Sequence, residues 1–128
     1  MKYATLPSPQ VIHQNAVDHG WYDGVTPETI GPDFIPSKLA LVHSEVTEAL
    51  EAFRNNNMTP HLVKNEDGST HLAHFSMPGE GAFDEELADA VIRIFDLAGF
   101  LDIDLETAIH MKHEYNKTRP HCHGGKVV

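Results

Sequence analysis

Four acidic residues stand in two pairs, and the members of each pair are three positions apart. The pairs are Glu45 with Glu48 and Glu86 with Asp89. Residues three apart in an α-helix lie on neighbouring turns, so each pair can direct two carboxylates to one place. Where two such helices pack side by side, four carboxylates meet, and so many like charges require protons or bound cations. Donors that are all oxygen favour magnesium or manganese over zinc, and the natural substrate of such a site is a polyphosphate.

A basic segment near the end of the chain is a second candidate for phosphate chemistry. It contains Lys117, Arg119 and Lys126, in a chain with only nine Lys and Arg in all. Lys and Arg side chains, together with exposed Gly amides, can clamp phosphates. We therefore predict these residues as phosphate-binding groups. The alternative is structural, because basic residues at the end of a helix also complement its dipole.

The apolar pattern predicts the elements that position these residues. Apolar residues recur at steps of three and four in segments 37–54 and 84–100, which predicts two helices with one acidic pair each. Shorter helices are predicted at 10–19 and, after a cap at Asp104, up to about residue 117. The residues expected to be buried in the third helix are Leu87, Ala90, Val91, Ile94, Leu97, Ala98 and Leu101.

The helical period is interrupted between the two acidic pairs. Segments 61–64 and 69–75 flank an Asp67-Gly68 step that favours a turn, which predicts a β-hairpin inserted at about residues 60–76. Residues 118–128 are predicted as a tail. The sequence thus indicates a single, mainly α domain over residues 1–128, with four or five helices and one small hairpin.

Composition narrows the class of partner. The formal charge of −10 disfavours nucleic acid and anionic membranes. The single cysteine, Cys122, cannot form an intramolecular disulfide, and no apolar run reaches the roughly 20 residues of a membrane-spanning helix. With no apolar core of a signal peptide at the start, we expect a cytoplasmic protein. Four short helices leave apolar stripes uncovered in a monomer, so we also expect a homodimer or homotetramer.

The acidic pairs and their flanking sequence resemble the MazG-like all-α nucleoside triphosphate pyrophosphatases, in particular their phage and bacterial branch. The resemblance rests on segments 38–54, 86–94 and 116–120, with His123-Gly124-Gly125-Lys126 after them, and it extends from Val11 over nearly the whole chain. One departure is the long gap between the acidic pairs, where short family members have a tighter connection. The resemblance implies a MazG-like bundle of four to five helices that assembles as a dimer or tetramer.

The activity implied by the resemblance is metal-dependent hydrolysis of a (deoxy)nucleoside triphosphate to the monophosphate and pyrophosphate. The implied metal ligands and catalytic carboxylates are Glu45, Glu48, Glu86 and Asp89. Two or more Mg²⁺ or Mn²⁺ ions would bridge phosphate oxygens and activate water, with Glu48 as the candidate general base. For Arg93, an intrahelical salt bridge with Asp89 is favoured over a role in phosphate binding.

The first helix and the connection after it contribute to the base pocket in similar enzymes, which makes Asn15, His19 and Trp21 the base-binding candidates. Asn can read a purine edge through paired hydrogen bonds, and Trp can stack on a base. A core anchor is the alternative for Trp21. Phage-type relatives act on deoxynucleoside triphosphates, so dGTP or dATP is the expected substrate, and the host cytoplasm the location if the protein is phage-encoded. A house-cleaning enzyme for dCTP or modified nucleotides and a non-catalytic, metal-binding helical module are the alternatives.

Overall fold

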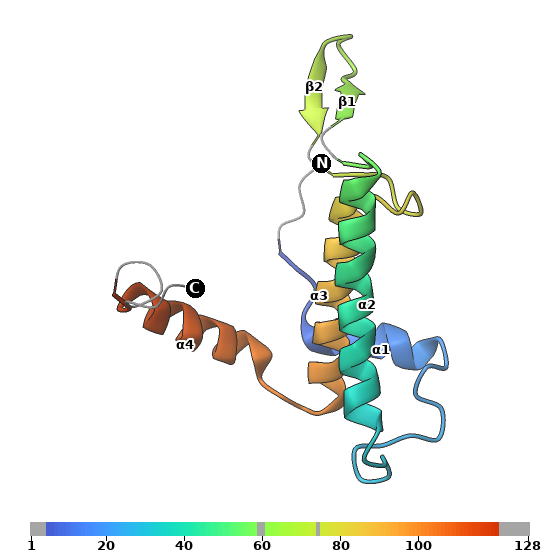
Figure 1. The fold of residues 1–128 in the computed structure, drawn as a ribbon, viewed down its shortest axis with the longest axis vertical. Helices are drawn as coiled ribbons and strands as arrows, with labels where there is room; N and C mark the ends of the chain where they lie inside the picture. The colour runs from blue at the N-terminus through green and yellow to red at the C-terminus, as the bar shows by residue number, and fades with distance from the viewer. Residues whose placement is uncertain (1–4, 59–60, 74, 121–128) are drawn as a thin grey trace.

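The computed structural model describes residues 5–58, 61–73 and 75–120. In this part of the chain the protein is mainly helical (Figure 1), with four helices and one two-stranded antiparallel sheet. The elements are α1 (Pro9–Asp18), α2 (Phe34–Arg54), β1 (His61–Lys64), β2 (Thr70–Ala73), α3 (Phe83–Phe100) and α4 (Leu105–Lys117). The predicted order of elements, with a hairpin between the two long helices, is confirmed.

Two predicted boundaries were wrong. α2 begins at Phe34 rather than at residue 37, because Pro36 lies in the first turn, where its missing N–H is no loss. β2 begins at Thr70 rather than at residue 69, because Ser69 belongs to the turn: its backbone N–H and its hydroxyl both donate to Asp67. The strand is described up to Ala73, and residue 74 of the predicted segment lies outside the described residues. The turn itself forms at the predicted Asp-Gly step, with Gly68 at a φ of +86° that a side chain would disfavour.

α2 and α3 lie side by side and run in opposite directions (Figure 1). Small side chains are buried on both helices, namely Ala49 and Ala52 on α2 and Ala90 on α3. Such residues let two backbones approach closely. The hairpin extends beyond the end of this helix pair, where α2 ends and α3 begins.

The other end of α3 is covered by α1 and by the connection that follows it. Gly99 allows this close approach, because a Cβ atom at that position would lie 2.6 Å from the Cβ of His13. Tyr22 stacks on Phe100 with ring centroids 4.8 Å apart, and the ring of Phe34 lies 5.1 Å from that of Phe100. This aromatic cluster joins the connection after α1 to the beginning of α2 and the end of α3.

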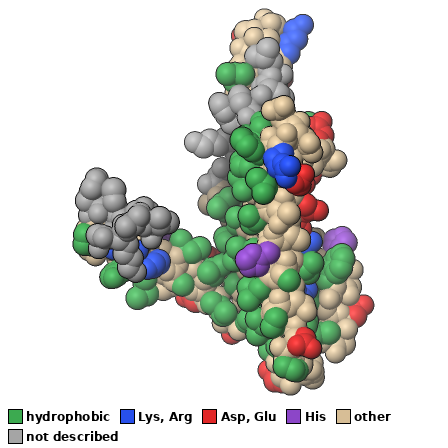
Figure 2. All heavy atoms as spheres, viewed as in Figure 1, with side chains coloured by type: hydrophobic (Ala, Val, Ile, Leu, Met, Phe, Trp, Pro, Cys, Tyr) green, Lys and Arg blue, Asp and Glu red, His purple; other side chains and the backbone are tan. Residues whose placement is uncertain are grey.

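The predicted core of α3 is only partly buried. Three predicted positions are buried, namely Ala90, Leu97 and Ala98. Three others are exposed by 43, 46 and 41 %, namely Leu87, Val91 and Ile94. Figure 2 shows hydrophobic side chains along the side of the helix pair that is turned toward α4, and acidic side chains along the opposite edge. The prediction was wrong for Leu87, Val91 and Ile94, because the described part of the chain does not bury them.

α4 projects away from the other helices (Figure 1). It begins as predicted, since the side chain of its N-cap residue Asp104 accepts a hydrogen bond of 3.1 Å from the backbone N–H of Thr107. None of its residues is buried, and Ile109, Met111 and Tyr115 are among the exposed hydrophobic side chains. Among the described residues, no helix is both long and apolar enough to span a membrane.

Candidate functional site

Three of the four predicted carboxylates meet where α2 and α3 lie side by side. Glu45 and Glu48 come from neighbouring turns of α2, and Glu86 comes from the first turns of α3. One oxygen of each residue lies within 4.8 Å of the others. Oxygen ligands of a single hard cation stand roughly 3–5 Å apart. The three oxygens are therefore close enough to share one metal ion.

Negative charge is concentrated in this cluster, and two of its three glutamates have raised pKa values. The hydrogen bond with Glu45 and repulsion from its charge raise the pKa of Glu48. Burial and the charge of Glu48 raise the pKa of Glu86. Both groups thus hold a proton more tightly than an isolated carboxyl. A cation placed among them would replace that proton.

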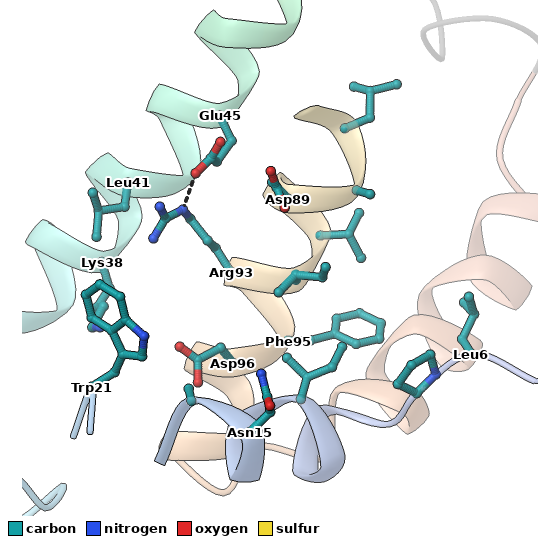
Figure 3. Close-up of a pocket in the computed structure, with 17 residues that line it drawn as sticks. Leu6, Asn15, Trp21, Lys38, Leu41, Glu45, Asp89, Arg93, Phe95 and Asp96 are labelled. Carbon is teal, nitrogen blue, oxygen red and sulfur yellow. Dashed lines mark hydrogen bonds and ion pairs between the residues drawn. The ribbon is translucent and has the colours of Figure 1, made fainter. Parts of the chain in front are cut away.

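Asp89, the fourth predicted carboxylate, lies one turn after Glu86 on α3, outside the group of three close oxygens. Burial and the charge of Glu45 raise its pKa. It lines the same groove as Glu45 (Figure 3). Asp89 is therefore placed to act beside the cluster, toward the groove.

Arg93 pairs with Glu45 across the two helices. Its Nε donates to Oε1 of Glu45 over 2.5 Å, and the Glu45 side chain is only 8 % exposed. Burial acts to raise the pKa of Glu45, but the hydrogen bonds from Arg93 and Glu48 outweigh it and lower that pKa. The predicted salt bridge between Arg93 and Asp89 was wrong, because the packing of α2 on α3 offers Arg93 a more deeply buried partner.

A groove of about 870 Å³ runs from the carboxylates to α1 and the connection after it (Figure 3). It contains two of the three predicted base-binding residues, Asn15 and Trp21. The Trp21 side chain is 75 % exposed, so it does not anchor the core. His19 does not line the groove; it is exposed at the end of α1, and its Nδ1 lies 2.7 Å from the carbonyl oxygen of Asn15.

The predicted phosphate-binding residues lie away from the carboxylates of their own chain. Lys117 is in the last turn of α4, where its Nζ donates to Oε1 of Glu114 over 2.7 Å. Arg119 is exposed just after α4, and this helix projects away from the α2–α3 pair (Figure 1). Lys126 lies outside the described residues.

Two charged residues of the groove, Lys38 and Asp96, were not predicted from the sequence. Asp96 accepts a hydrogen bond of 2.7 Å from the Tyr22 hydroxyl, and its other carboxylate oxygen lies 2.9 Å from Nδ1 of His13. Lys38 places its Nζ 4.6 Å from the centroid of the Tyr22 ring. A sequence signal existed for Asp96, because it follows Asp89 by seven positions and therefore lies on the same face of α3.

The chain was compared with protein-family models, curated proteins and solved structures, and none of them matches it.

Proposed function

We propose that this protein is a metal-dependent pyrophosphohydrolase of deoxynucleoside triphosphates, related to the MazG-like enzymes. The observation that carries the proposal is that Glu45 belongs both to the three-glutamate cluster and to a groove with an exposed indole. A cluster of carboxylate oxygens suits the Mg²⁺ or Mn²⁺ that accompanies a polyphosphate. An exposed Trp offers a stacking surface for a base. The two ends of a nucleotide thus have matching chemistry at the two ends of one groove.

Bound divalent ions would neutralise the phosphate oxygens and lower the pKa of a coordinated water. Glu45, Glu48 and Glu86 would hold them, with Asp89 beside them. Glu48 is the candidate proton acceptor, because its exposed side chain lies both in the cluster and open to water.

The proposed reaction consumes one water molecule. Its oxygen forms a bond to the α-phosphorus, the bond from that phosphorus to the bridging oxygen breaks, and pyrophosphate leaves with that oxygen. Glu48 takes the proton of the water. Arg93 lines the groove next to Glu45 and is 41 % exposed, so its remaining N–H donors can bind phosphate oxygens as charge develops.

Lys117 and Arg119 can serve this site only from a second copy of the chain, since α4 leads them away from their own carboxylates. A homodimer or homotetramer would also cover the exposed hydrophobic side chains of α2, α3 and α4. We therefore include the oligomer in the proposal, with the basic end of one α4 at the acidic edge of another subunit.

The proposal is tested by incubating the pure protein with each of the four deoxynucleoside triphosphates and with Mg²⁺ or Mn²⁺. We expect the monophosphate and pyrophosphate in equal amounts from at least one purine nucleotide. Orthophosphate as the only inorganic product would refute the proposed bond cleavage. If no nucleotide is turned over with either metal, the proposed enzymatic activity is refuted.

The second candidate is a helical module that binds cations without catalysis. It is favoured by one observation, namely that Lys117 and Arg119 lie away from the carboxylates of the same chain. This candidate predicts tight Mn²⁺ binding by calorimetry together with no turnover in the assay above.

A further inference from the structure

Asp96 is a carboxylate held firmly in the wall of the groove. The Tyr22 hydroxyl donates to its Oδ2 over 2.7 Å, and His13 Nδ1 lies 2.9 Å from its Oδ1. Its side chain is 17 % exposed. The rings of His13 and Tyr22 are themselves in edge contact, with centroids 4.7 Å apart. The orientation of the carboxylate is therefore set by two packed aromatic side chains.

This carboxylate has acceptor capacity left for a ligand. Each carboxylate oxygen can accept about two hydrogen bonds, and each oxygen of Asp96 has one partner within the described chain. Figure 3 shows Asp96 between Trp21 and Asn15, at the end of the groove opposite Glu45. A planar ring stacked on the Trp21 indole would present its edge to Asp96 and Asn15.

The spacing along α3 relates Asp96 to the cation site. Asp89, Arg93 and Asp96 line the groove at intervals of four and three residues, which places them on one face of the helix. Seven residues advance an α-helix by about 10 Å. A nucleotide with its phosphates at Asp89 and Arg93 would therefore lie along α3, with the sugar between them and Asp96 and the base at Asp96.

We propose that Asp96 selects guanine as the base of the bound nucleotide, an inference that rests on the proposed function above. Guanine carries two adjacent donors on its pairing edge, the ring N1–H and the 2-amino group, and a carboxylate accepts both at once. The amide of Asn15 then donates to the 6-carbonyl oxygen. Adenine presents an unprotonated ring nitrogen at the central position, which leaves the carboxylate without a donor. His13 and Tyr22 are positioning residues, because they act through Asp96.

The first experiment compares nucleotides on the unmodified protein. We expect kcat/KM for dGTP to exceed that for dATP by about 100-fold or more, because a polar site strongly rejects a ligand that lacks its donors. Deoxyinosine triphosphate lacks only the 2-amino group of guanine. Its kcat/KM should therefore lie between those of dGTP and dATP, at about a tenth of the dGTP value. Equal kcat/KM for dGTP and dATP would overturn the proposal for Asp96 while leaving the pyrophosphohydrolase intact.

The second experiment uses Asp96→Asn and deoxyxanthosine triphosphate. Xanthine has a carbonyl oxygen where guanine has its 2-amino group, and an Asn amide can donate to that oxygen while it accepts from N1–H. We expect kcat/KM for dGTP to fall by about 100-fold and that for the xanthine nucleotide to rise by at least tenfold. If Asp96 has only a structural role, Asp96→Asn should lower kcat/KM for all nucleotides by the same factor. That result would overturn the proposal.

The matched control is Asp18→Asn, which lies on α1 but outside the groove. It should leave kcat/KM for all four nucleotides unchanged. Far-ultraviolet circular dichroism checks that Asp96→Asn is folded; if it is not, the nucleotide series on the unmodified protein still decides. If no nucleotide is turned over, the proposed function fails. Calorimetric binding of non-hydrolysable dGTP and dATP analogues then tests Asp96, and equal affinities would overturn its role.

Discussion

α2 and α4 both carry charged residues that the sequence places at a phosphate site, but they lie in different surroundings. α2 packs along α3, which buries Glu45 and brings Glu48 next to Glu86. α4 has no buried residue, and its Lys117 pairs with Glu114 of the same helix. The difference shows that packing against a second helix brings charged residues from separate segments into one cluster. A helix without such a partner satisfies its charges locally.

The largest expected effect is that of Glu48→Gln. It removes a carboxylate of the cluster and the proposed proton acceptor, so we expect turnover to fall by about 10³-fold or more. Because the side chain is exposed, the variant should fold normally. The measurement is pyrophosphate release at saturating metal, with the melting temperature as the check on folding.

The matched control for this variant is Glu51→Gln, one turn further along α2. Glu51 is also exposed, but it pairs with Arg54 rather than with the cluster. It should retain nearly full activity. If both variants lose activity equally, the prediction that the cluster carboxylates take part in catalysis is wrong.

The next effect concerns α4. If Arg119 acts on the site of a second copy, Arg119→Ala should lower kcat/KM by about 100-fold. Mixed dimers of one Arg119→Ala chain and one Glu48→Gln chain should then regain activity, up to about half of the original, because one of the two sites in each mixed dimer is intact. Co-expression with two affinity tags supplies the mixed species. No recovery would place Arg119 in its own chain's site or in none.

A third prediction compares an ion pair in each region. Arg93→Met leaves the buried carboxylate of Glu45 without its partner, so we expect a loss of about 1–3 kcal/mol in the free energy of unfolding. Lys117→Met breaks an exposed pair on α4 and should change stability little. Urea denaturation measures both. Equal losses would mean that burial does not distinguish the two pairs. The double variant Glu45→Gln with Arg93→Met should recover part of the stability that Arg93→Met alone loses, because it no longer leaves an unpaired buried charge.

The smallest effect is a pH dependence of stability. The pKa values of Glu48 and Glu86 are raised in the folded chain, so the folded state binds more protons than the unfolded state. Their contribution is favourable at pH values below the ordinary carboxyl range and is lost as pH rises through the raised pKa values. Mg²⁺ or Mn²⁺ should therefore raise the melting temperature more at pH 7.5 than at pH 5. In Glu48→Gln this difference should shrink.

The sequence determined the elements and their order. Helical periodicity located the four helices, an Asp-Gly step located the hairpin turn, and the Asp104 side chain caps α4 as its type predicts. These features depend on interactions between residues close in the chain, which the sequence records directly. Spacing also identified the acidic pairs, because residues three apart share a helix face wherever the helix lies.

Tertiary packing decided which of these residues meet. The pairing of Arg93 with Glu45 joins residues 48 positions apart, and the place of Asp96 between His13 and Tyr22 joins residues 83 and 74 positions apart. The sequence pattern alone does not specify the crossing of α1 over α3 or the direction in which α4 leaves. Burial of side chains from distant segments sets the crossing of α1 over α3. α4 has no buried residue, and it carries Lys117 and Arg119 away from the carboxylates of its own chain.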